Sequence, residues 1–126
     1  MAKAVIFVCR YCLFAPQQPT QEGKTGGQHL WEALQEHCRI WDPQGEVEFR
    51  QVDCLSGCSH PATVAVAAPG KLSCLFGDLP PLEAAPQILT FVEHYLASPD
   101  GAVPRSQRPP LLQPGLLAKI PAWDSP

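Results

Sequence analysis

Four of the six cysteines occur as two close pairs, and this feature constrains the fold more than any other. Cys9 and Cys12 form a C-x2-C motif, whereas Cys54 and Cys58 form a C-x3-C motif. Short spacings of this kind allow both thiolates of a pair to turn toward one metal centre. The two pairs can therefore bind one metal centre only if the fold brings them to one place.

Each pair follows a segment with the character of a β-strand. Residues 4–9 (AVIFVC) form a β-branched apolar run, which is typical of a strand covered on both faces. Residues 46–53 (EVEFRQVD) alternate and predict a second strand, and the apolar spacing of residues 28–41 predicts a helix between the two. A strand–helix–strand unit is expected to be parallel and right-handed. Both cysteine pairs would then lie at the same edge of the sheet.

The remaining elements complete one α/β fold. Residues 62–68 and 71–76 predict two further strands, joined by a turn in which Pro and Gly suit the central positions of type II. Residues 86–97 predict a last helix, and residues 10–27 predict a loop. The order β-α-β-β-β-α predicts a four-stranded mixed sheet that is flanked by two helices.

The character of the chain changes near its end. Residues 1–98 hold all the predicted elements, whereas residues 99–126 are rich in proline and show no helical or strand period. Leucines in this second segment argue against free coil. We expect a domain over residues 1–98 and an extended C-terminal strap over residues 99–126.

Composition excludes several classes of function. The formal net charge is -3, so the chain has no overall basic surface for nucleic acid. No run reaches the roughly 18 apolar residues that a membrane-spanning helix needs, and no clear export signal precedes the first strand. We therefore expect a cytoplasmic protein, and in a reducing compartment paired cysteines indicate metal or redox chemistry.

The cysteine spacing allows three kinds of site. Four thiolates suit either tetrahedral zinc or an iron–sulfur cluster, and spacing alone does not separate the two. A zinc-binding structural or metal-delivery module without a redox role therefore stays an alternative. A disulfide-active C-x-x-C would need a helix that starts at the motif, but Pro16 and a Gln/Gly-rich loop follow Cys12.

The motifs VCRYC, DCLSGCSHP and RSQRPPLLQPGLLAKIPAW resemble those of thioredoxin-like 2Fe-2S ferredoxins. They are similar to an uncharacterised bacterial family within that group, described as predicted metal-binding proteins. The resemblance covers nearly the whole chain and implies a thioredoxin-like core. It also implies a one-electron carrier rather than an enzyme. The ligands of its 2Fe-2S cluster would be Cys9, Cys12, Cys54 and Cys58.

The same resemblance implies a larger redox enzyme as partner. A link to cobalamin chemistry follows only from the genes near which that family is often encoded. By analogy with the ferredoxins, a homodimer is a further expectation. Typical ferredoxins of this group separate their first two cysteines more widely than Cys9 and Cys12 are separated here.

Other candidate residues have simpler interpretations. Cys38 and Cys74 lie on the apolar faces of predicted elements, where a free cysteine acts as a small hydrophobic residue. His60 follows Cys58 closely, and we interpret it as a neighbour of the site or a surface residue. Arg10, between two proposed ligands, is suited either to offset negative charge or to sit exposed in its loop.

Overall fold

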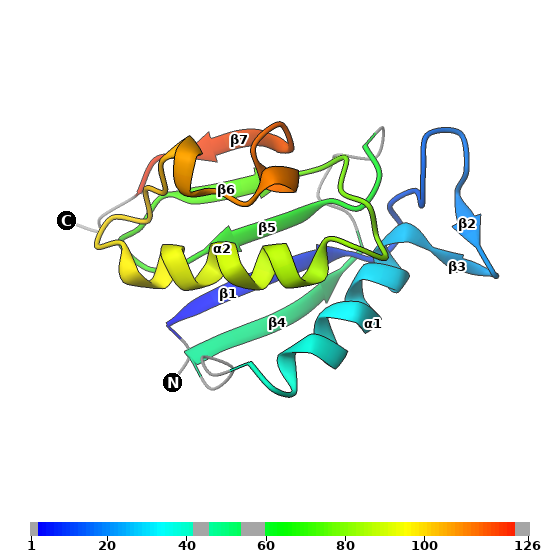
Figure 1. The fold of residues 1–126 in the computed structure, drawn as a ribbon, viewed down its shortest axis with the longest axis horizontal. Helices are drawn as coiled ribbons and strands as arrows, with labels where there is room; N and C mark the ends of the chain where they lie inside the picture. Colours follow the sequence, from blue (N-terminus) through cyan, green and yellow to red (C-terminus); the bar gives the residue numbers. More distant parts are fainter. Residues whose placement is uncertain (1–2, 42–45, 54–59, 123–126) are drawn as a thin grey trace.

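The computed structural model describes residues 3–41, 46–53 and 60–122 (Figure 1). Five strands form one mixed sheet in the order β4-β1-β5-β6-β7, and a short two-stranded hairpin, β2-β3, projects from one end. The strands of the sheet are β1 (Ala4–Cys9), β4 (Val47–Val52), β5 (Val64–Ala67), β6 (Ser73–Phe76) and β7 (Leu116–Ile120). The hairpin is β2 (Thr20–Gln21) and β3 (Lys24–Thr25), the α-helices are α1 (Gly26–Cys38) and α2 (Ala85–Ala97), and the 3-10 turns are η2 (Arg105–Gln107) and η3 (Pro110–Leu112).

β1 and β4 are parallel, as the strand–helix–strand pattern predicted. Their register places Ala4 opposite Val47 and Cys9 opposite Val52. The carboxyl ends of both strands therefore lie side by side at one edge of the sheet. β5 and β6 are antiparallel to their neighbours, so the predicted mixed sheet is confirmed.

The core lies between the sheet and the two helices, which pack on the same face of the sheet (Figure 1). Alternate strand residues point into this core and are fully buried, whereas their neighbours on the opposite face are only half-buried. Neither helix is long and apolar enough to cross a membrane, and no other helix within the described ranges is. The largest strand side chains in the core are Ile6, Val8, Val64, Val66 and Phe76.

The turn between β5 and β6 has the predicted form. The amide of Lys71 donates to the carbonyl oxygen of Ala68 at 3.2 Å, and Gly70 has a φ of 71°. A positive φ at this position is what a type II turn requires, and glycine adopts it without steric cost.

The sheet is one strand wider than the sequence predicted. Within the C-terminal strap, β7 pairs antiparallel with β6 and covers an edge that four strands would leave open. The sequence LLAKI lacks the alternation of apolar and polar residues that marks a strand. It forms a strand because it pairs with the neighbouring β6. The predicted loop over residues 10–27 likewise contains the short β2-β3 hairpin.

The start of α1 is packed directly on the end of β1. The helix begins two residues earlier than predicted, at Gly26, and Thr25 caps it by accepting a hydrogen bond from the amide of Gln28 at 3.1 Å. A Cβ on Gly27 would overlap the carbonyl oxygen of Cys9, and one on Gly26 would overlap that of Leu13. The two glycines therefore let the helix approach the cysteine-bearing loop.

We predict that Gly27→Ala loosens the packing of α1 against the end of β1 and the cysteine-bearing loop. In an ordinary helix the substitution would stabilise by roughly 0.5–1 kcal/mol, but here the methyl group meets backbone atoms and we expect destabilisation of about 1–3 kcal/mol. Alkylation of Cys9 and Cys12 by iodoacetamide in metal-free protein should accelerate, as mass spectrometry would show. Gln35→Ala, at an exposed position of the same helix, is the control; unchanged alkylation in Gly27→Ala would contradict the packing role.

A second prediction concerns the strap. The side chain of Leu112 is fully buried in the core, so Leu112→Ala should lower the free energy of unfolding by about 2–5 kcal/mol in urea titrations. Ile120 in the same segment is 58% exposed, and Ile120→Ala should cost only about 0.5 kcal/mol. Equal unfolding midpoints for the two variants would show that the strap does not contribute to the core.

Candidate metal centre

Cys9 and Cys12 lie together at the carboxyl end of β1. Cys9 is the last residue of the strand, and Cys12 follows in the loop that leads away from it. Both side chains are buried, and both are free thiols. A pair of neighbouring buried thiols that form no disulfide matches the donor chemistry of zinc and iron–sulfur sites.

Each thiol has a defined partner. The Cys9 Sγ donates to the carbonyl oxygen of Asp53 at 3.7 Å, across the parallel pair of strands. The Cys12 Sγ donates to the Thr63 Oγ1 at 3.1 Å, at the start of β5. Three neighbouring strands thus supply the surroundings of the two sulfur atoms.

The environment holds Cys12 in its neutral form when no metal is bound. Burial, reinforced by the adjacent Cys9 thiol, raises the pKa of Cys12 to about 11, although the hydroxyl of Thr63 acts in the opposite direction. A metal ion binds thiolate, so its charge must replace the proton. Without a metal, Cys12 is therefore a neutral thiol near neutral pH rather than a free thiolate nucleophile.

Backbone hydrogen bonds fix the loop that carries Cys12. The amide of Arg10 donates to the carbonyl oxygen of Val52 at 2.6 Å, and the Thr25 hydroxyl donates to that of Arg10 at 2.5 Å. The amide of Gly27 donates to the carbonyl oxygen of Cys12 at 3.3 Å. The first turn of α1 therefore faces the loop, and its positive end favours negative charge there.

The second predicted pair lies outside the described residues. Cys54 and Cys58 fall in the segment 54–59, and the described chain stops at Asp53 and resumes at His60. Among the described residues, no group of three or more metal-ligating side chains occurs. The structure thus brings together Cys9 and Cys12, and Asp53 directly precedes Cys54 in the chain.

Arg10 lies on the rim of the site. Its guanidinium forms an ion pair with Asp53, with 3.3 Å between Nη1 and Oδ1, and lies 5.9 Å from the ring centroid of Tyr11. Both charged side chains are substantially exposed, so the pair adds little to stability. It does connect the two strand ends and keeps a positive charge near the thiols.

The remaining candidates occupy the places that the sequence predicted. Cys74 is buried in the core, and Cys38 packs against the outside of the core. His60 pairs with Asp78, with 2.9 Å between Nδ1 and Oδ2, and its carbonyl oxygen accepts a hydrogen bond from Thr63 at 3.5 Å. The contact of Thr63 with the site was not predicted from the sequence. The available signal was a polar residue directly before an apolar strand and within a few residues of a cysteine pair.

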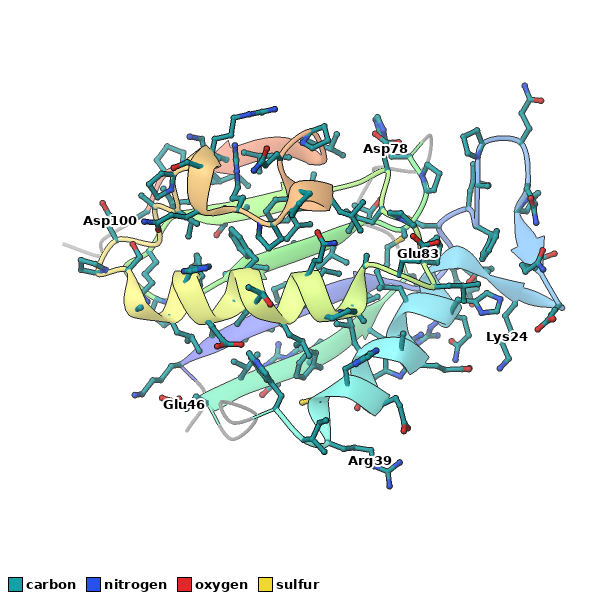
Figure 2. All side chains as sticks on the ribbon, in the orientation of Figure 1. Lys24, Arg39, Glu46, Asp78, Glu83 and Asp100 are labelled. Carbon is teal, nitrogen blue, oxygen red and sulfur yellow. The ribbon has the colours of Figure 1, made fainter. Side chains whose placement is uncertain are left out.

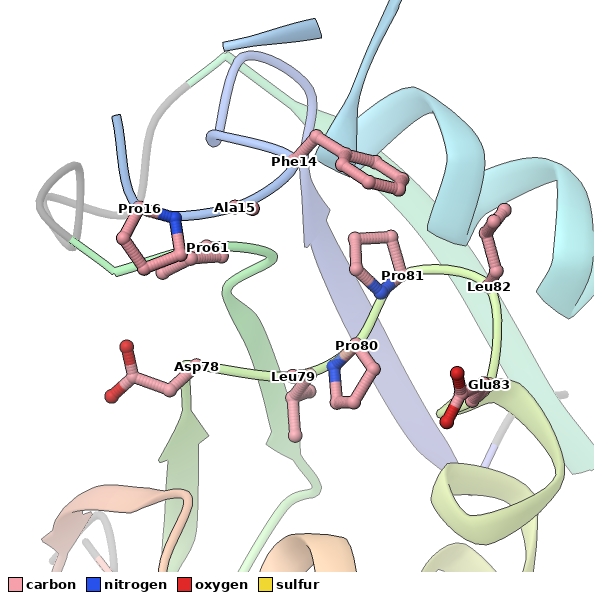
Figure 3. A pocket seen from close by; sticks show the side chains of 10 residues that line it. All are labelled: Phe14, Ala15, Pro16, Pro61, Asp78, Leu79, Pro80, Pro81, Leu82 and Glu83. Carbon is pink, nitrogen blue, oxygen red and sulfur yellow. The ribbon is translucent and has the colours of Figure 1, made fainter. Parts of the chain in front are cut away.

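A mostly apolar groove of about 360 Å³ adjoins the loop after Cys12 (Figure 3). Phe14 and Pro16 from that loop form one side, and Leu79, Pro80 and Pro81 form the other. Two carboxylates on its lining, Asp78 and Glu83, lie at the end of the sheet away from Asp100 (Figure 2). A molecule that approaches the cysteines from this side would meet an apolar surface with an acidic margin.

Two solved structures share this fold. One is a thioredoxin-like [2Fe-2S] ferredoxin from Aquifex aeolicus, with 17% identity, a TM-score of 0.57 and coverage of 94% of each chain. The other is the wild-type thioredoxin-like [2Fe-2S] ferredoxin from Aquifex aeolicus at 1.5 Å resolution, with 19% identity and a TM-score of 0.56; the match covers 94% of this chain and 99% of that one. At such low identity the likeness establishes the thioredoxin-like ferredoxin fold, as the sequence resemblance predicted.

Sequence comparison places the chain in a family. A search of the curated proteins finds no match. The family model described as "Protein of unknown function (DUF1636)" matches residues 6–122, which include both cysteine pairs and most of the strap. The chain therefore belongs to the DUF1636 family.

Proposed function

We propose that this protein binds one 2Fe-2S cluster through Cys9, Cys12, Cys54 and Cys58 and carries single electrons for a partner enzyme. The observation that carries the proposal is the bond from the Cys9 thiol to the carbonyl oxygen of Asp53. Consecutive Cα atoms are about 3.8 Å apart, so the chain cannot take Cys54 far from Cys9. This proximity supports the proposal that both pairs bind one centre.

The surroundings of the thiols support a negatively charged centre. An iron–sulfur cluster with four thiolate ligands is anionic, and hydrogen bonds to its sulfur atoms tune its potential. Thr63 is placed to donate its hydroxyl proton to the Cys12 sulfur once that sulfur is a thiolate. The start of α1 adds positive potential at the same place.

The position of the site suits electron exchange with another protein. The cysteines lie at the edge of the sheet, and the groove beside Phe14 and Pro81 offers a partner an apolar contact close to them. In this proposal the chain supplies the carrier and the partner supplies the catalyst. A cytoplasmic location, a homodimer and the link to cobalamin chemistry stay predictions of the sequence.

Metal analysis of the purified protein tests the proposed centre. Protein isolated without oxygen should contain about two irons and two acid-labile sulfides per chain, and dithionite should bleach its visible absorption. Replacing each proposed ligand with serine should remove most of the iron. Cys38→Ser and Cys74→Ser are the matched controls and should retain it, because Cys74 lies in the core and Cys38 packs against the core.

Three results would contradict this assignment. Colourless protein that contains zinc instead of iron would favour the zinc module. Iron retained in Cys12→Ser but lost in Cys74→Ser would show that the ligand set is wrong. A mixed disulfide trapped by Cys12→Ser would indicate a thiol–disulfide enzyme.

Thr63 offers a prediction about the reduction potential. Thr63→Val keeps the side-chain shape but removes the hydroxyl beside Cys12, so the reduced, more negative state loses more stabilisation. If the hydrogen bond differs by about 1 kcal/mol between the two states, the potential should fall by about 40 mV in a spectroelectrochemical titration. Thr63→Ser retains the hydroxyl and should keep the wild-type value; identical potentials in all three proteins would exclude a contact between Thr63 and the cluster.

A further inference from the structure

A second hollow lies far from the cysteine edge, beneath the C-terminal strap. It has a volume of about 260 Å³ and is lined by strap residues 102–105 and Arg108, by residues of β6, β7 and α2, and by Leu72. We call it the strap pocket. Its inner wall is apolar and is formed by Leu72, Cys74 and Phe91. η2, in the orange part of the ribbon, lies over this part of the fold (Figure 1).

The opposite wall of the strap pocket carries three cations and no carboxylate. Arg105, Arg108 and Lys119 line it, although acidic residues outnumber basic ones in the chain as a whole. None of the three forms an ion pair with another residue of the described ranges, whereas Arg10, Arg39 and Arg50 each have an acidic partner. Like charges repel, so an anion bound among the three cations would lower their repulsion.

The guanidinium of Arg108 is the most informative group. Its Nε is buried and has no hydrogen-bond partner among the described residues. A buried donor without an acceptor is costly, and the cost is greater for a charged group. By contrast, the Arg105 Nη1 donates to the carbonyl oxygen of Gln113 at 3.2 Å. Among the described residues, the strap therefore supplies no acceptor for the Arg108 Nε.

The charges reach the apolar wall. Lys119 is the register partner of Cys74 in the β6-β7 pair, so both side chains lie on the same face of the sheet. Burial raises the pKa of the Cys74 thiol, and the charges of Lys119 and Arg108 act against that rise. A ligand in the strap pocket would touch cationic groups at one end and apolar groups at the other.

We propose that the strap pocket binds a small organic anion, with its carboxylate or phosphate group against Arg108, Arg105 and Lys119 and its apolar body against Phe91. Guanidinium groups bind both anions through paired hydrogen bonds. The volume lies just below the range of sites for drug-sized ligands, so the anion is small. The inference is independent of the proposed cluster, because the two sites lie at different positions along the sheet. Cys74 in the strap pocket pairs with Val66, whereas the cysteine site lies beyond Val64, at the start of β5.

The test uses the full chain and three probes: benzoate, phenyl phosphate and the neutral benzyl alcohol. Calorimetry gives the affinity, and ¹⁵N NMR of the arginine Nε–Hε groups reports the place of binding. Benzoate or phenyl phosphate should move the Arg108 Nε–Hε signal at millimolar concentration, and benzyl alcohol should not. The tighter of the two anions identifies the preferred head group.

Two substitutions locate the site. Arg108→Gln and Lys119→Gln should each raise the Kd of the preferred anion about tenfold or more, since each removes a charge-assisted contact. Arg50→Gln, which removes an arginine from the far strand β4, is the control and should leave the Kd unchanged. Lys119 is exposed, so Lys119→Gln provides the test even if Arg108→Gln does not fold.

Any of three results would overturn the inference. One is that neither anion produces heat or moves the Arg108 signal. Another is that Lys119→Gln and a folded Arg108→Gln bind as tightly as the unaltered chain. The third is that benzyl alcohol binds as tightly as benzoate, which would show that the cations take no part.

Discussion

The parallel pairing of β1 with β4 is the constraint on which the rest of the structure depends. Its register sets Cys9 opposite Val52, so the chain leaves both strands at the same place. A shift by one residue would turn the side chains of Ile6 and Val8 out of the core, and burial of these residues therefore holds the register. The position of the cysteine site is thus a consequence of how the core packs.

The helix α1 has two roles in this arrangement. As the connection between β1 and β4 it makes their parallel pairing possible, and its packing on the sheet covers the core. Its first turn also binds the loop that carries Cys12, because Gly26 and Gly27 allow backbone-to-backbone contact. The strap acts along the side of the sheet, where β7 pairs with the outer side of β6 and Leu112 enters the core.

Much of this arrangement could be predicted from the sequence, because a β-branched apolar run indicates a buried strand and apolar residues at helical spacing indicate a helix. The β-branched run Ala4–Cys9 and the helical spacing after it specified the parallel pair and hence the cysteine edge. The fifth strand, Leu116–Ile120, could not be predicted in this way, since it forms by pairing with an open edge. Thr63 became visible only in space, because it meets Cys12 across a large separation in the chain. The buried Arg108 Nε, which has no hydrogen-bond partner among the described residues, likewise has no signal in the sequence.

The central claim is that both cysteine pairs bind one inorganic centre. X-ray absorption at the iron K-edge of the purified protein tests it most directly, because it identifies the atoms around the metal. A 2Fe-2S cluster held by the four cysteines should give a first shell made only of sulfur, about four atoms per iron, with a second iron nearby. A first shell that mixes sulfur with nitrogen or oxygen and lacks an iron neighbour would mean that the pairs bind metal separately, and would contradict the account.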